Sequence, residues 1–234
     1  MKDEVPGSIP GLGFKKVKIF WQLYFANPAI FIGQAITNFG TVGSIFPTSA
    51  PLRRRVVEIS LEGKTSIETV VIHGVGCGEF VYELLRQSHE RGIRVGRIIA
   101  MDVNETFVDR TRALLPIILK RFPNESEVTL ETMDAMDTPA YLARSGVNKA
   151  NVIIGTIPYS MLQSSEAWAK MYKESTDKFV YYTYEPYFKP PKHLRATEEM
   201  LEALQTHFGK VEEGARVRLN LPPAKVIVAS NTPG

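Results

Sequence analysis

The spacing of apolar positions changes in a regular order from residue 68 onward. Short apolar runs rich in β-branched residues alternate with longer segments whose apolar positions fall on one face of a helix. The runs that predict strands are 68–73, 97–102, 128–133, 151–156 and 178–184, and the segments that predict helices are 79–91, 104–120, 138–145, 162–174 and 196–208. This alternation is typical of a parallel sheet covered on both faces by helices.

The end of the chain departs from that alternation. Two further strand patterns, "ARVRLNL" at 215–221 and "AKVIVAS" at 224–230, are joined through Pro222 and Pro223. Because this connection is too short for a crossover helix, the two strands must run antiparallel. We therefore predict an α/β fold with a doubly wound, seven-stranded, mostly parallel sheet and an antiparallel C-terminal hairpin.

The N-terminal part has a different pattern. Residues 14–25, "FKKVKIFWQLYF", place Lys15 and Lys18 on one face of a predicted amphipathic helix and Phe20 and Trp21 on the other. Such a helix either lies in a membrane interface or packs on the protein with its lysines in solvent. Both interpretations stay open from the sequence.

These patterns divide the chain into two regions. We expect an N-terminal helical appendage over residues 1–55, in which 41–55 covers a ligand site, and a single α/β domain over 56–234. The net charge is +3, but residues 1–60 hold seven Lys and Arg against three Asp and Glu. A positive N-terminal end favours an anionic partner, either a phosphate-bearing lipid or a nucleic acid.

The sequence disfavours four features: a membrane-spanning helix, a cleaved signal peptide, an internal disulfide and a metal site. The uncharged segment 19–52 is broken by Pro, Gly and Asn, so we expect no spanning helix, and we expect no cleaved signal peptide. The single cysteine, Cys77, excludes an internal disulfide and favours a reducing, cytoplasmic compartment. The four histidines are scattered, so we predict no metal site.

A glycine-rich loop follows the first predicted strand. In "VVIHGVGCGEF", Gly74, Gly76 and Gly78 allow backbone amides to approach a ligand at the start of a helix. The next two strands end near Asp102 and Asp134, where carboxylates would accept hydrogen bonds from ribose hydroxyls and an adenine amine.

Other interpretations of the same residues are helix caps for the two aspartates and a dinucleotide for the glycines. Taken in order, the loop and the aspartates predict a nucleoside ligand. The GxGxG spacing and the final hairpin favour S-adenosylmethionine over NAD.

Five segments together carry a resemblance to a known family. They read "TVGSIFPTSAPL" (41–52), "HGVGCGEF" (73–80), "MDVNETF" (101–107), "GTIPYSML" (155–162) and "NLPPAKVIVA" (220–229). The sequence resembles a class I S-adenosylmethionine-dependent methyltransferase with a Rossmann-like domain. More narrowly, it is similar to the bacterial phospholipid N-methyltransferases that are related to ribosomal RNA adenine dimethylases.

The resemblance implies roles for individual residues. It implies that the cofactor is bound by Gly74, Gly76, Gly78, Asp102, Val103, Asp134, Ala135, Thr156, Thr48 and Ser49. In this set Asp102 holds the ribose, Asp134 and Ala135 meet the adenine, and Thr48 and Ser49 close the site. The resemblance further implies that Thr156, Pro158 and Tyr159 border the transferred methyl group and act in catalysis.

Two positions depart from the family pattern. Ile72 stands where related enzymes carry a glutamate, and His73 follows it; this histidine either bonds nearby backbone at a strand end or takes part in binding or proton transfer. Thr156 stands where adenine dimethylases carry Asn or Asp, and a hydroxyl is a poorer acceptor for an adenine amine.

We therefore expect N-methylation of an amine, foremost the phosphatidylethanolamine headgroup, by a cytoplasmic protein that is peripheral on the inner face of a membrane. The alternatives are an RNA adenine or small-molecule N-methyltransferase and a cofactor-less binding protein of the same fold. The oligomeric state stays open.

Overall fold

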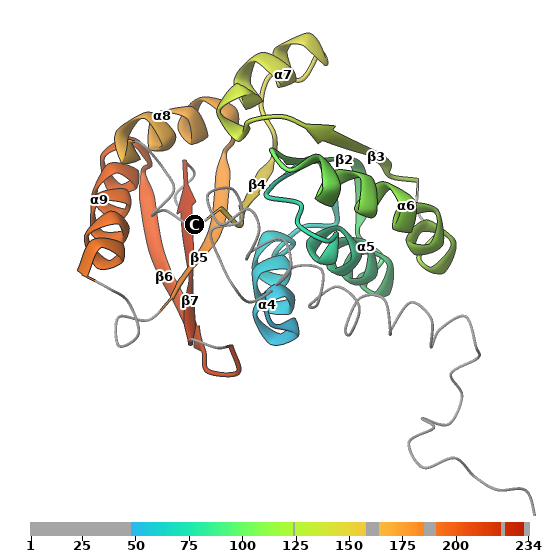
Figure 1. The fold of residues 1–234 in the computed structure, drawn as a ribbon, viewed down its shortest axis with the longest axis horizontal. Coiled ribbons are helices and arrows are strands. Elements are labelled where there is room, and N and C mark those ends of the chain that lie inside the picture. The colour runs from blue at the N-terminus through green and yellow to red at the C-terminus, as the bar shows by residue number, and fades with distance from the viewer. Residues whose placement is uncertain (1–47, 124, 158–163, 185–190, 221–222, 232–234) are drawn as a thin grey trace, which may run out of the picture.

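The computed structural model describes residues 48–123, 125–157, 164–184, 191–220 and 223–231, and the structural statements below concern those residues. They form a seven-stranded sheet in the order β3-β2-β1-β4-β5-β7-β6 (Figure 1). The strands are β1 Ser66–His73, β2 Arg94–Asp102, β3 Glu127–Thr132, β4 Val152–Gly155, β5 Lys178–Tyr184, β6 Lys210–Val217 and β7 Ala224–Ser230. The first five strands pair in parallel, and β7 pairs antiparallel with both β5 and β6. The predicted fold class is therefore confirmed.

Helices cover both faces of this sheet (Figure 1). They are α4 Ala50–Ser60, α5 Glu79–Arg91, α6 Glu105–Arg121, α7 Thr138–Arg144, α8 Ser165–Ser175 and α9 Pro191–His207, with a short 3₁₀ helix, η2, at Ala135–Asp137. The buried side chains form two clusters, one between the sheet and α4, α5 and α6, and the other between the sheet and α7, α8 and α9. Two such layers bury both faces of the central strands, which explains their nearly continuous apolar runs.

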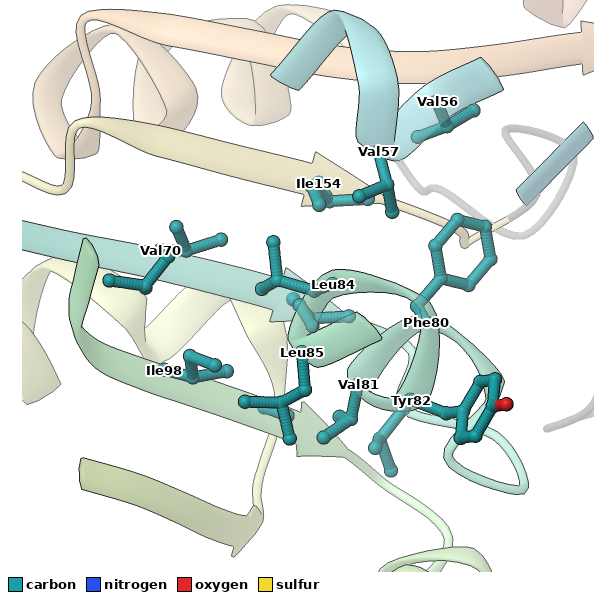
Figure 2. Packing of buried hydrophobic residues seen from close by; sticks show 14 of the residues in the cluster. Val56, Val57, Val70, Phe80, Val81, Tyr82, Leu84, Leu85, Ile98 and Ile154 are labelled. Atoms are coloured by element: carbon teal, nitrogen blue, oxygen red, sulfur yellow. The ribbon is translucent and has the colours of Figure 1, made fainter. Parts of the chain in front are cut away.

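Helix α5 fixes the end of the glycine loop in space, because it begins directly after Gly78. Its apolar residues Phe80, Val81, Leu84 and Leu85 are at most 4% exposed. Figure 2 shows this helix packed against residues of α4 and of the central strands, among them Val56, Val57, Val70, Ile98 and Ile154. Burial of a Leu or Phe side chain contributes roughly 1.5–3 kcal/mol, so the helix that follows the loop is held firmly.

The strand order creates a switch point at the centre of the sheet. Strand β1 pairs with β2 on one side and with β4 on the other. The chain therefore leaves β1 toward β2 and β3, and later returns to build the opposite half. Open α/β sheets bind ligands at the carboxyl ends of the strands beside such a point.

Some local predictions were wrong or lie outside the described residues. The sixth strand was expected at 215–221 but spans Lys210–Val217, because it is the edge strand and its polar residues hide the alternation. Helix α4 runs across the expected boundary between residues 55 and 56 and packs into the core, although the division into domains itself remains a prediction. The predicted amphipathic helix at 14–25 lies outside the described residues. Within the described part of the chain, every helix is too short or too polar to cross a bilayer.

Candidate functional site

The loop after β1 needs glycine at three positions. Gly74, Gly76 and Gly78 have φ angles of 82°, 52° and 86°, a region that other residues rarely adopt. A Cβ atom on Gly74 would lie only 2.4 Å from Oγ1 of Thr156, so this glycine also allows the close approach of β4. The amide of Gly74 donates to the carbonyl of Met101 at 2.8 Å, which joins the loop to the end of β2.

Asp102 is bonded directly to the loop. Its Oδ2 accepts a hydrogen bond from the amide of Gly76 at 3.0 Å, and its Oδ1 accepts one from the amide of Asn104 at 3.0 Å. Burial raises the pKa of this carboxyl, and the amides of Asn104, Gly76 and Val103 oppose that change in part. Val103 itself is 52% exposed beside it. The predicted ribose-binding carboxylate therefore lies at the carboxyl edge of the sheet and is bonded to the glycine loop.

A second carboxylate stands over the same loop. Glu79 opens α5, and its Oε2 lies 3.7 Å from the place that a Cβ on Gly76 would occupy. Burial raises the pKa of Glu79, whereas Arg53 and the backbone amides of Glu79 and Cys77 act to lower it. Arg53, on α4, is 8% exposed and donates to the carbonyl of Thr48. Sequence reasoning missed both charged residues; the position of Glu79 directly after the last loop glycine was the available signal.

Thr156 connects the two halves of the sheet. Its hydroxyl lies 2.8 Å from the carbonyl oxygen of His73 and 2.7 Å from that of Gly74, and its amide also donates to the carbonyl of His73 at 3.0 Å. The hydroxyl proton is thus shared by backbone acceptors and holds the loop against β4. The other two predicted catalytic residues, Pro158 and Tyr159, lie outside the described residues.

His73 is completely buried at the end of β1. Its Nε2 lies 2.8 Å from the hydroxyl of Thr138, which in turn lies 2.6 Å from the carbonyl of Ala135. Its ring stacks on Tyr172 with the centroids 5.6 Å apart. Burial lowers the pKa of His73 to about 3, so the imidazole is neutral at physiological pH.

The predicted adenine contacts, Asp134 and Ala135, lie at the start of η2. Asp134 is exposed and caps this helix, because its Oδ1 accepts a hydrogen bond from the amide of Met136 at 2.9 Å. Ala135 is 3% exposed. The capping role of Asp134 is therefore present, and its contact with adenine remains a prediction.

Thr48 and Ser49 lie at the start of α4, and they are bonded to the β5–β7 half of the sheet as well as to α4 itself. The hydroxyl of Thr48 lies 2.7 Å from that of Tyr182 on β5, and the amide of Ser49 donates to Oδ1 of Asn220 at 3.0 Å. Ser49 also caps α4 by accepting from the amide of Leu52. The structure thus brings together the loop glycines, Asp102, Thr156 and the Ala135 segment, whereas Thr48 and Ser49 border the other half.

A separate cavity of about 460 Å³ lies at the opposite edge, lined by residues at the amino ends of β1 and β2 such as Ser66, Glu68 and Arg94. Ligands of open α/β sheets bind at the carboxyl edge, so the glycine loop is the stronger candidate. Among the described residues, no three acidic, histidine or cysteine side chains group so as to hold a metal ion.

Similarity to known proteins is seen at the level of the fold. The sequence matches no protein-family profile and no curated protein. An O-methyltransferase from Bacillus cereus, solved in complex with SAH, is 10% identical, with 91% of this chain and 96% of that chain covered and a TM-score of 0.54. A SAM-dependent methyltransferase from Aquifex aeolicus is 15% identical, with coverages of 77% and 89% and a TM-score of 0.53.

Spermidine synthases have the same fold. The enzyme from Thermotoga maritima is 16% identical with a TM-score of 0.53, and the match covers 77% of this chain. The chain spans 59% of the length of the two spermidine synthases that it matches. The protein therefore has the Rossmann-like fold of class I methyltransferases, a fold that also carries other transfer reactions, so the reaction must be argued from the site.

Proposed function

We propose that the protein is an S-adenosylmethionine-dependent methyltransferase that acts on an amine. One contact supports this function above the others: the amide of Gly76 donates to Oδ2 of Asp102 at 3.0 Å. It joins the central glycine of the loop to an acidic strand end, as a site for the ribose of a nucleoside requires.

The charges at the loop favour this cofactor over a dinucleotide. In a dinucleotide site, the second glycine lets the backbone approach a pyrophosphate. Here the amide of that glycine, Gly76, is already bonded to a carboxylate, and the carboxylate of Glu79 stands above it. Although Arg53 partly offsets the charge of Glu79, the carboxylate of Asp102 repels a pyrophosphate and attracts a sulfonium or ammonium group.

The residues present therefore fit S-adenosylmethionine. When bound, this cofactor would supply the electrophilic methyl group. Asp102 would accept hydrogen bonds from the ribose hydroxyls, the loop backbone would line the ligand, and Thr156 would keep the loop in register with β4. Transfer to a neutral amine needs alignment and loss of a proton to water more than a protein nucleophile.

We further propose that the acceptor is the phosphatidylethanolamine headgroup. The support is the resemblance to phospholipid N-methyltransferases. Two segments that carry it, 41–52 and 220–229, contain Ser49 and Asn220, and these residues are bonded to each other. In this proposal Tyr159 contacts the cationic headgroup, an interaction worth roughly 0.5–2 kcal/mol. The N-terminal lysines would hold the protein on an anionic leaflet, at about 1 kcal/mol each.

Calorimetry with S-adenosylhomocysteine tests the cofactor. We expect the full chain to bind it and the Asp102→Ala variant to lose binding. Asp109→Ala is a matched control, because Asp109 is an exposed acidic residue on α6 that pairs with Arg112. A folded wild-type protein that fails to bind would support the alternative of a cofactor-less binding protein.

Transfer of labelled methyl groups identifies the acceptor. Vesicles that contain phosphatidylethanolamine should be labelled, and charge reversal of Lys15, Lys16 and Lys18 should reduce vesicle binding without changing S-adenosylhomocysteine affinity. Labelling of RNA with steeply salt-dependent binding would instead favour an RNA methyltransferase. Labelling of soluble amines alone would favour a small-molecule enzyme.

A further inference from the structure

His73 is a costly residue for its position. It lies at the end of the central strand, is completely buried, and packs in an apolar cluster with Met101 and Tyr172. Its Nδ1 is buried and has no hydrogen-bond partner among the described residues. A buried, unpaired acceptor costs about 1–3 kcal/mol, so an apolar side chain would be the more stable choice here.

The hydrogen bonds around the ring fix its tautomer. The hydroxyl of Thr138 has one proton, and its shortest contact is the carbonyl of Ala135 at 2.6 Å. The hydroxyl also lies 3.4 Å from the sulfur of Met101, a weak acceptor. With its proton directed to Ala135, the contact of the hydroxyl with Nε2 of His73 at 2.8 Å is one in which Nε2 donates and the hydroxyl accepts. The chain of donors therefore runs from His73 to Thr138 and on to Ala135.

Three segments of the candidate site meet at this one residue. The main chain of His73 leads directly into Gly74, and its carbonyl accepts hydrogen bonds from Thr156. Its side chain reaches Thr138, the first residue of α7, which holds the carbonyl of Ala135. His73 thus joins the glycine loop, the end of β4 and the segment predicted to contact adenine.

We propose that His73 is a positioning residue, which uses its Nε2 proton to hold the Ala135–Thr138 turn at the depth where adenine binds. This inference rests on the proposed function, since it assigns the turn to the cofactor. His73 would position the segment that contacts adenine, a role that neither Asp102 nor the loop glycines can fill. The side chain does not touch the reacting atoms, so cofactor affinity should depend on it and the chemical step should not.

Substitutions separate this role from simple packing. His73→Phe keeps a ring against Tyr172 but removes the donor, and Thr138→Val removes the hydroxyl with little change in shape. Loss of one such hydrogen bond weakens binding about three- to tenfold, so each variant should show that loss in affinity for S-adenosylhomocysteine. His73→Gln, which offers an amide donor, and Thr138→Ser, which keeps the hydroxyl, should restore most of the affinity.

The double variant gives the sharper result. Because both substitutions break the same contact, His73→Phe with Thr138→Val should bind no more weakly than the weaker single variant. With S-adenosylmethionine as substrate, KM should rise while kcat at saturation stays the same. Additive losses, or unchanged affinity in a folded His73→Phe protein, would overturn the inference. Absence of binding by the wild-type protein would overturn the proposed function itself.

Discussion

Acid should destabilise this protein in a way that depends on His73. The pKa of this histidine is lowered from 6.5 to about 3 by burial, so between these values the unfolded chain takes up a proton that the folded protein refuses. The contribution of neutral His73 to the free energy of unfolding is therefore fully present above pH 6.5, and it is lost as the pH falls toward 3. Each pH unit in this window removes about 1.4 kcal/mol, which amounts to about 2 kcal/mol at pH 5.

The assay is urea unfolding at pH 7.5 and pH 5.0, followed by the fluorescence of tryptophan, since Trp168 is buried in the same cluster. Carboxylates also titrate in this range, so the informative quantity is the difference between the wild-type protein and His73→Phe. The variant should lose about 2 kcal/mol less than the wild type on acidification.

Other titratable groups near the His73 ring do not change the direction of this loss of stability with acid. Tyr172 on α8 is the titratable side chain that stacks on His73, and burial raises its pKa, so it stays neutral throughout. A matched control is His89→Gln, which replaces an exposed histidine on α5 outside this cluster. Equal losses in the wild type and His73→Phe would refute the reasoning.

Two further predictions concern the loop. Gly74→Ala should destabilise the protein and abolish S-adenosylhomocysteine binding, because the new Cβ would lie 2.4 Å from Oγ1 of Thr156. The control Gly146→Ala, also at positive φ but with nothing within 4 Å, should cost only about 1 kcal/mol of backbone strain. Similar melting temperatures for the two variants would contradict this prediction. Thr156→Val should lower stability by about 1 kcal/mol and weaken S-adenosylhomocysteine binding several-fold, with Thr156→Ser close to wild type, because the hydroxyl donates to backbone carbonyls. A fall in kcat at unchanged cofactor affinity would instead support the catalytic role that the resemblance implies for Thr156.

The sequence predicts the fold well where strands are buried on both faces. Strand β5 and helix α5 have the predicted bounds, because their apolar patterns begin and end at clear breaks. Strands β1 and β2 begin earlier than expected, since their first residues alternate between exposed and buried positions and resemble a loop. Helix α4 was not predicted because three consecutive arginines, Arg53 to Arg55, mask its narrow apolar face.

The sequence likewise predicts some residues of the candidate site and misses others. Asp102 and the loop glycines could be placed from sequence because strand ends in a parallel sheet share one edge. The contacts of Arg53, Glu79, Thr138 and His73 could not, since each depends on how separate helices pack over the sheet. No local pattern encodes such packing, and a lone histidine at a strand end has several common explanations.

The bonds of Thr48 and Ser49 have a consequence for folding. Strands β1, β2 and β3 follow one another along the chain and can pair early. Ser49 and Asn220, by contrast, are 171 residues apart in sequence, and Thr48 and Tyr182 are 134 apart. Contacts of such high sequence separation form late, because loop closure must come first. We therefore expect the amides at the start of α4 to gain protection from hydrogen exchange last during refolding, and to exchange through local opening while the β1–β3 half stays closed.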